Sequence, residues 1–192
     1  MSDRLFDATL DIPPLRGRHT LLRPALQDDL VWLYRIATTG AVGTLWRFHG
    51  SLLTIDAFAA LVTRDAAALM VIESNESSPS RIGLVQLTQL NLRSHTAHLT
   101  AFLDEEHQRK AWPIEALVNF VTYVFAAYNL RKIYAEVLET EMERYQPFVG
   151  TMFEEEGRLR DHEFLFGHHL DVHILAITRD QWTKAWAELE VR

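Results

Sequence analysis

Apolar and polar residues follow two periods along the chain, and the changes between them predict the order of its elements. The clearest helical period lies between residues 114 and 128, where apolar side chains recur every three or four residues. An extended apolar run, 97–103, precedes it, and a charged connector, 104–110, joins the two. The predicted buried helix face consists of Ile114, Leu117, Val118, Val121, Val124, Phe125 and Tyr128. A strand that feeds a helix in this way either aims helix N–H groups at a phosphate or is plain scaffold.

The same criteria predict the remaining elements. Further strands are predicted at 19–23, 68–72, 81–87, 132–138, 158–166 and 170–177, and further helices begin at Asp28–Asp29 and after Thr54 and cover 142–150 and 180–189. The resulting order, βααβββαβαββα, predicts a mixed α/β architecture with one βαβ crossover. The sequence contains no internal repeat or linker, so we expect a single domain over 1–192 after a loosely ordered lead-in, 1–14.

Composition excludes several classes of protein. With 48% apolar and 23% charged residues and a net charge of −7, the chain is typical of a globular protein and has no basic block for nucleic acid. Because it contains no cysteine, disulfides, thiolate catalysis and cysteine metal sites are excluded. The first residues lack a signal-peptide core, and no apolar run reaches membrane-spanning length. We therefore expect a cytoplasmic protein with no membrane partner.

Three segments together resemble one family. They are Leu15–Pro24 with Asp28–Asp29, then Ile114–Phe125 with Asn129–Ile133, and Phe153–Asp161 with Gly167, Asp171 and Trp182. In their order and spacing they resemble GNAT-superfamily N-acetyltransferases, in particular the group that includes ribosomal-protein N-terminal acetyltransferases. No single segment is diagnostic, but together they extend over most of the chain.

This resemblance implies a fold and a reaction. The GNAT fold is a twisted mixed sheet of about seven strands with helices on both faces. Acyl-CoA is expected in a V-shaped opening between the strands near 97–103 and 132–138, with its pyrophosphate on N–H groups at the start of the following helix. The acceptor is a primary amine of a small molecule, such as a metabolite or antibiotic, or of a protein N-terminus, and it attacks the thioester directly. The resemblance implies acetyl-CoA or another acyl-CoA as co-substrate and no metal, and the family often forms homodimers.

The cofactor positions depart from the family pattern. The resemblance assigns cofactor binding to Leu103, Gln108, Arg109, Lys110, Ala111 and Trp112. Ala111 adds a methyl where the family has glycine, and Pro113 removes an N–H donor. Arg109 and Lys110 either compensate for this loss or are solvated surface. Three alternatives follow: an altered loop that still binds acyl-CoA, a different donor such as a carrier-protein thioester or an aminoacyl-tRNA, or a non-catalytic GNAT-like binding protein.

Two residues are the catalytic candidates. His98 lies on the predicted cleft strand where relatives often carry Glu, and an imidazole has an unperturbed pKa of about 6.5, which suits a general base. Its alternative is an ordinary hydrogen-bonded strand histidine. Tyr145 is the candidate for protonating the thiolate, although Phe148 occupies the place where the family has its Tyr. Pro147 is expected to disturb the helix that carries Tyr145 unless this helix begins later.

Four residues are candidates for substrate binding. Trp46, Phe48 and His49 lie between the first two helices, where the family places its substrate loop, although core packing explains them equally well. His169 alternates with Asp171 and His173 and therefore shares their face of the strand. This face is expected at the substrate end of the cleft, and a metal site of two imidazoles and a carboxylate is the less favoured alternative.

Overall fold

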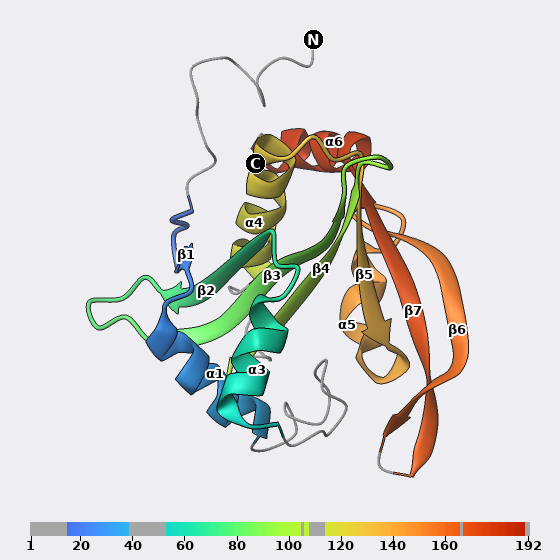
Figure 1. Cartoon of the computed structure of the whole chain (residues 1–192). Helices are drawn as coiled ribbons and strands as arrows, with labels where there is room; N and C mark the ends of the chain where they lie inside the picture. The colour runs from blue at the N-terminus through green and yellow to red at the C-terminus, as the bar shows by residue number, and fades with distance from the viewer. Residues whose placement is uncertain (1–14, 39–52, 105, 108–113, 166, 191–192) are drawn as a thin grey trace. The chain divides into compact units, whose positions relative to one another are not determined.

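The computed structural model describes residues 15–38, 53–104, 106–107, 114–165 and 167–190, with no side chains described at 186–190. Figure 1 shows the strands and helices in chain order. The strands are β1 (Thr20–Pro24), β2 (Ala68–Ser74), β3 (Arg81–Asn91), β4 (Thr96–Leu103), β5 (Lys132–Leu138), β6 (Glu154–Leu165) and β7 (His168–Thr178). The helices are α1 (Gln27–Thr38), α3 (Ile55–Thr63), α4 (Ile114–Ala127), α5 (Met142–Tyr145) and α6 (Arg179–Glu190). The predicted order of elements is confirmed.

The strands form a seven-stranded sheet in the order β1-β2-β3-β4-β5-β7-β6. Its β1–β2 and β2–β3 ladders are antiparallel, as are the β5–β7 and β6–β7 ladders, whereas β4 and β5 run parallel. The predicted mixed sheet is therefore confirmed. The chain divides into two compact units, an amino-terminal unit of Ile12–Gln89 with Thr100–Tyr123 and a carboxy-terminal unit that includes Leu90–Leu99 and Val124–Arg192.

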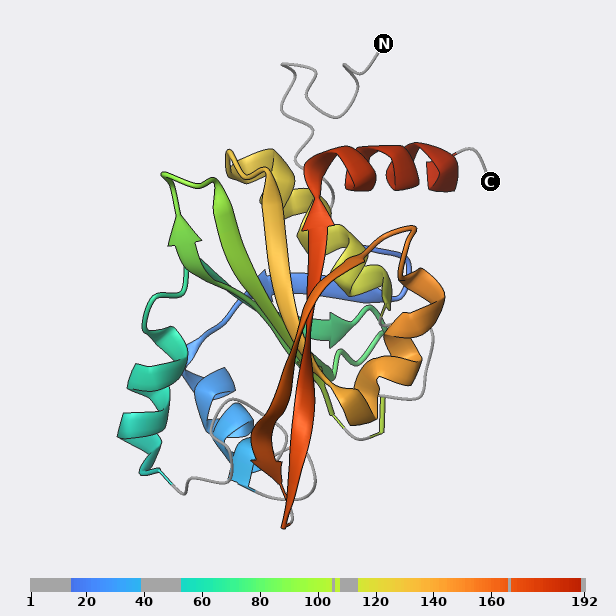
Figure 2. The same cartoon turned by 90° about the vertical axis from the view of Figure 1, so that its right-hand side faces the viewer.

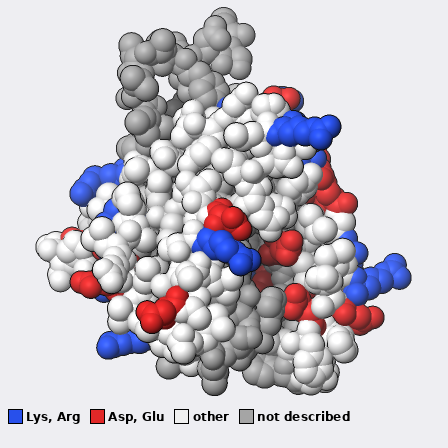
Figure 3. Space-filling model, viewed as in Figure 1, with Lys and Arg blue, Asp and Glu red and all other residues white. Residues whose placement is uncertain are grey.

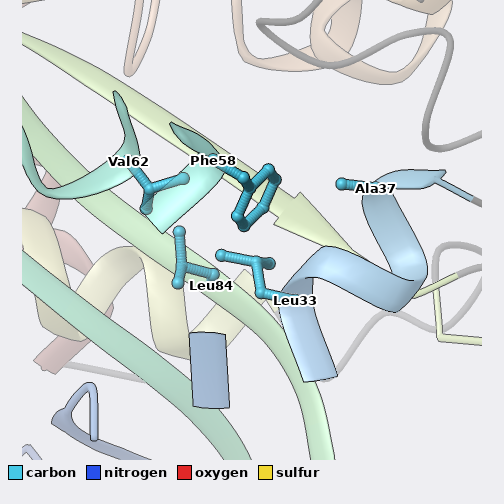
Figure 4. Close-up of a cluster of buried hydrophobic side chains, with 5 residues drawn as sticks. All are labelled: Leu33, Ala37, Phe58, Val62 and Leu84. Atoms are coloured by element: carbon cyan, nitrogen blue, oxygen red, sulfur yellow. The ribbon is translucent and has the colours of Figure 1, made fainter. Parts of the chain in front are cut away.

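The core of the amino-terminal unit lies where α1 and α3 contact β3. Leu33 and Ala37 are one helical turn apart on α1, and Phe58 and Val62 are one turn apart on α3, so each pair presents one apolar face. In Figure 4, Leu33, Phe58 and Val62 gather around Leu84 of β3, and Ala37 points toward the Phe58 ring. Thr54 caps α3 as predicted, because its side chain accepts a hydrogen bond from the N–H of Ala57. The two helices are thereby fixed on one part of the sheet.

Helix α4 begins and ends close to its predicted bounds, and its buried face matches the prediction in part, because Val121, Val124 and Phe125 are buried as predicted. Ile114 is 42% exposed, whereas Ala116, Phe120 and Val124 are completely buried at four-residue steps. The prediction assigned Ile114 to the core because it considered only large apolar residues. Small Ala116 occupies the close-packed position instead, and Ile114 in the first turn stays at the surface.

The core of the carboxy-terminal unit lies between α5, β5 and β7. Its buried members are Val137, Met142 and Leu175, with Tyr145 and Phe153 packed against them. The predicted helix over 142–150 is wrong in length, because α5 ends at Tyr145 and a 3₁₀ turn covers Gln146–Phe148. Pro147 has no N–H to continue the α-helical ladder, so the chain tightens and turns there.

The last two strands form a long twisted hairpin, which Figure 2 shows along its length. Strand β6 begins at Glu154, four residues before the predicted start, and bulges between Leu159 and Glu163. Asp161 adopts a φ of 50° within this bulge and donates its N–H to the Asp171 carboxylate at 2.7 Å. Such extra residues bend an edge strand and weaken its tendency to pair with other chains. Within the described residues, no helix is long and apolar enough to cross a membrane.

Candidate active site

His98 lies where the parallel ladder of β4 and β5 ends. The ladder pairs Thr96 with Lys132 and ends with His98 opposite Tyr134. Directly paired residues of parallel strands share a face, and Glu136, two residues after Tyr134, lies on the same face. We call His98, Tyr134 and Glu136 the His98 cluster. Its members come from neighbouring strands of the carboxy-terminal unit, so the local backbone fixes their spacing.

The geometry of the His98 cluster suits the handling of a cationic amine. The His98 and Tyr134 rings have centroids 5.5 Å apart, and His98 Nδ1 lies 3.9 Å from Glu136 Oε1. The side chains of His98 and Glu136 are 30% and 55% exposed, so solvent reaches both. The Lys132 ammonium lies 5.5 Å from the centroid of the Tyr134 ring and also pairs with Glu156. A carboxylate and an imidazole are therefore accessible to an ammonium group, and the position of Lys132 shows that the Tyr134 ring accepts a cation on one of its faces.

Tyr145 lies on the opposite face of β5 from the His98 cluster. It packs against the core that contains Val137, and side chains alternate along the strand, so Val137 and Glu136 point to opposite faces. The Tyr145 and Phe153 rings meet edge to face, with centroids 6.1 Å apart. Burial and the nearby Glu141 carboxylate raise the pKa of the Tyr145 phenol, which therefore keeps its proton at neutral pH.

The face of β7 that carries His169 is occupied by ion pairs and ring contacts. Asp171 is paired with Arg158, and His173 Nδ1 lies 2.7 Å from Glu155 Oε1. His169 is exposed and packs against Phe164, with ring centroids 5.1 Å apart. The structure does not bring the three residues 169, 171 and 173 together as metal ligands, because two of them are turned toward partners on β6. In the part of the chain that is described, no group of three or more acidic or imidazole side chains is arranged to hold a metal ion.

The predicted donor side of the site lies in the amino-terminal unit. Leu103 is the last residue of β4, and the next residue, Asp104, donates its N–H to the Ile82 carbonyl at 2.9 Å. The Asp104 carboxylate then accepts the N–H of His107 at 3.0 Å and lies against its imidazole. The predicted residues Gln108, Arg109, Lys110, Ala111 and Trp112, and Trp46, Phe48 and His49, lie outside the described residues.

Two acidic residues near these predicted sites were missed by sequence reasoning. Glu136 alternates with Tyr134 on a strand whose position was predicted, so its face could have been derived from the two-residue period. Glu115 stands in the first turn of α4, where acidic residues are common, and nothing in the sequence indicates the partners that it has in the structure.

Figure 3 shows acidic and basic side chains interspersed over the face of the molecule that is in view, without a continuous basic patch among the described residues there.

Comparison with known proteins identifies the family. The acetyltransferase (GNAT) domain matches residues 22–174, so the chain belongs to the GNAT family of acetyltransferases. The spermidine N(1)-acetyltransferase of Vibrio cholerae serotype O1 is 24% identical over 165 residues, which are 84% of this chain and 94% of that protein. The predicted family is confirmed, whereas the narrower resemblance to ribosomal-protein N-terminal acetyltransferases stays a prediction.

Solved structures of the spermidine N-acetyltransferase from Vibrio cholerae share the fold. The crystal structure in complex with CoA and spermine superposes with a TM-score of 0.75 at 22% identity and covers 86% of this chain and 99% of that one. A second crystal structure, in complex with manganese ions, has a TM-score of 0.70 at 22% identity over 86% of this chain and 96% of that chain. The chain is thus a GNAT-type N-acyltransferase, which uses an acyl-CoA as donor and an amine as acceptor.

Proposed function

We propose that this enzyme acetylates a primary amine of a polyamine, with acetyl-CoA as the donor. The observation that carries the proposal is the His98 cluster, which offers a carboxylate and an aromatic ring beside an imidazole. Two further points support it. The relatives described above are spermidine acetyltransferases, and the net charge of −7 favours the approach of a polycation. A peptide N-terminus carries only one such ammonium group and gains less from this field.

In this proposal each member of the His98 cluster has its own task. Glu136 and the Tyr134 ring attract the ammonium group of the acceptor, and the His98 imidazole removes one proton from it. The freed amine lone pair then attacks the thioester carbonyl. Backbone N–H groups near Leu103 polarise this carbonyl in the way that the family resemblance implies. The carboxylate of Glu136 also favours the imidazolium that forms after proton transfer, because it lies 3.9 Å from His98 Nδ1.

Tyr145 is the proposed donor of a proton to the leaving thiolate. Its place on the opposite face of β5 from His98 separates the group that removes a proton from the group that returns one. A phenol whose pKa is raised by burial is protonated throughout the neutral range. The phenol is therefore protonated when the C–S bond breaks, and the second proton that the attacking nitrogen loses as the amide forms replaces the one that Tyr145 gives to the thiolate.

Replacing Tyr145 by phenylalanine is expected to lower kcat by about 100-fold, a usual contribution of a general acid. The ring packs on Phe153 in both proteins, so folding and donor binding should be retained. We expect the KM for acetyl-CoA to stay within about twofold of the wild-type value, because only an interaction of the transition state is lost. Steady-state kinetics measure both constants. An unchanged kcat would contradict the assignment, and Phe148→Leu serves as a control at the neighbouring aromatic residue.

The residues that would hold acetyl-CoA are proposed from the family resemblance and from the hydrogen bonds that Glu115 accepts at the start of α4. Gln108, Arg109, Lys110, Ala111 and Trp112 precede α4, whose first-turn N–H groups would receive the diphosphate. The one acidic side chain in that first turn, Glu115, accepts hydrogen bonds from three backbone N–H groups. Its charge is thus already compensated. The described start of α4 is therefore compatible with an anionic ligand.

Binding and turnover can be tested separately. CoA at 100 times its Kd should stabilise the fold by about 2.7 kcal/mol and raise the melting midpoint by about 5–10 °C. Turnover is followed as thiol release from acetyl-CoA, and a thiol reagent reports only on the product because the chain contains no cysteine. Spermidine, spermine and putrescine are compared with a peptide that has a free N-terminus and no lysine.

We expect the polyamines to be acetylated and the peptide to react at least about tenfold more slowly, because the second cationic group adds binding energy. Acetylation of the peptide alone would overturn the polyamine proposal while leaving the GNAT activity intact. CoA binding without turnover of any amine would favour a binding protein. Turnover only with a carrier-protein thioester or an aminoacyl-tRNA would show a different donor.

A further inference from the structure

The first turn of α4 is anchored to the start of β1 and the two residues before it through one carboxylate. Glu115 is the second residue of α4, and its carboxylate accepts the backbone N–H groups of Arg18 at 2.7 Å, His19 at 2.9 Å and Thr20 at 3.0 Å. The Thr20 hydroxyl donates a fourth hydrogen bond at 2.8 Å. Three consecutive amides that converge on one anion form a nest, a motif that proteins commonly use to bind anionic ligands.

The segment around this carboxylate is shaped to fit it. A Cβ added to Gly17 would lie 2.4 Å from the Glu115 carboxyl carbon, so any other residue there would displace this carboxylate from its present position. Gly17 donates its N–H to the Thr20 carbonyl at 2.7 Å, and its own carbonyl accepts from the Asn75 side chain at 3.2 Å. Thr20 is fully buried. Burial raises the pKa of Glu115, but the bonds from His19, Thr20 and Arg18 outweigh it and hold this pKa below its usual range.

The hydrogen bonds to Glu115 weaken the repulsion between its carboxylate and an anion that approaches the start of α4. A carboxylate in the first turn of a helix is favoured by the dipole, but it also repels an anion that approaches the same amides. Here four donors compensate the Glu115 charge and fix its position. They also join the first turn of α4 to Arg18, His19 and the first residue of β1, Thr20, across about 95 residues of sequence. A helix held in this way keeps its first-turn amides in one orientation.

We propose that Glu115 is a positioning residue that holds the first turn of α4 in the orientation needed to bind the donor diphosphate. The inference rests on the proposed function, in which these amides receive the diphosphate of acetyl-CoA. Glu115 itself does not touch the donor. It acts through the helix, and the Arg18–Thr20 nest acts through Glu115.

The test compares donors with and without the diphosphate. Glu115→Gln keeps the size of the side chain but removes the charge and turns an NH₂ group toward N–H donors. Acetyl-CoA and acetyl-pantetheine serve as donors in kinetics, and the Kd of CoA is measured by calorimetry. Glu76→Gln, at an exposed position in the loop between β2 and β3, is the matched control.

We expect Glu115→Gln to raise the KM for acetyl-CoA and the Kd of CoA by about tenfold or more, as after loss of a charge-assisted contact. The KM for acetyl-pantetheine should change by less than about twofold, because this donor does not reach the first turn. Thr20→Val removes only the hydroxyl donor, and we expect it to raise the KM for acetyl-CoA and the Kd of CoA by a smaller factor. This variant replaces Glu115→Gln in the test if Glu115→Gln does not fold.

A purely structural role would raise both KM values together or only lower the melting midpoint, and either result would overturn the inference. Unchanged CoA binding in both variants would do the same. Failure of the proposed function gives a different result, since the wild-type protein would then not use acetyl-CoA with any polyamine.

Discussion

Replacing His98 by alanine is expected to lower kcat for polyamine acetylation by about 10²–10⁴-fold, the usual contribution of a positioned general base. The imidazole is 30% exposed on β4, so its removal leaves no buried cavity of the size of a core side chain and the variant should fold. Binding of CoA should be retained, because the donor is proposed to contact the amides near Leu103 and α4 instead. Steady-state kinetics with spermidine and calorimetry with CoA measure the two effects.

The pH profile distinguishes a base from a structural histidine. If His98 removes the proton, the acidic limb of kcat/KM in the wild-type enzyme should disappear in His98→Ala. His95→Ala is the matched control, because this nearby histidine is also partly buried and its Nδ1 lies 2.8 Å from the Asn129 carbonyl. We expect Glu136→Gln to raise the KM for the amine more than it lowers kcat. An unchanged rate in His98→Ala would refute the assignment of the base.

The fold could be predicted from the sequence where local signals agree with packing. Strand β5 and the cap of α3 at Thr54 match their predictions, because a short apolar strand and a threonine before an amphipathic helix are strong signals. The prediction failed at 142–150, where it noted Pro147 but still extended the helix past it. It also misplaced Ile114, because the burial of small Ala116 depends on how closely α4 packs.

The candidate site could be predicted only in part. His98 was selected by its position in the family pattern, and its strand follows from the apolar run around it. The partners of Glu115 lie about 95 residues away in sequence, and a contact over this distance depends on tertiary structure that no local period encodes. The pairings of Asp171 and His173 with β6 depend in the same way on the register of the β6–β7 ladder and its bulges.

Replacing Asp29 by asparagine is expected to cost about 3–5 kcal/mol of stability, which is typical of breaking a buried ion pair on one side. The Asp29 carboxylate is 1% exposed and accepts hydrogen bonds from both Arg23 and Arg81. It also accepts the N–H of Leu26 at 2.7 Å, which satisfies a free donor at the start of α1. The asparagine variant leaves two guanidinium groups near an amide. Urea unfolding at neutral pH measures the loss.

The acid dependence of stability gives an independent check on Asp29. Hydrogen bonds from Arg23, opposed by burial, and then those from Leu26 and Arg81 lower the pKa of Asp29 to about 2 from its usual 3.8. A lowered folded-state pKa adds stability that is complete above the unfolded-state pKa and is lost as the pH falls through the folded-state value. The wild-type protein should therefore lose about 2 kcal/mol between about pH 4 and 2 from this group, and the asparagine variant should not.

Glu73→Gln is the matched control for this network. Glu73 contacts Arg23 at 2.6 Å, but Arg23 keeps its two hydrogen bonds to Asp29 when the Glu73 charge is removed. We therefore expect a loss of about 1 kcal/mol, close to the value of a single surface pair. Equal losses in the two variants would show that Asp29 is not the centre of the network. The expected result is that Asp29→Asn loses more free energy of unfolding than Glu73→Gln at neutral pH and that this difference narrows below about pH 3. It would show that the ionised carboxylate of Asp29 holds α1 on β1 and β3.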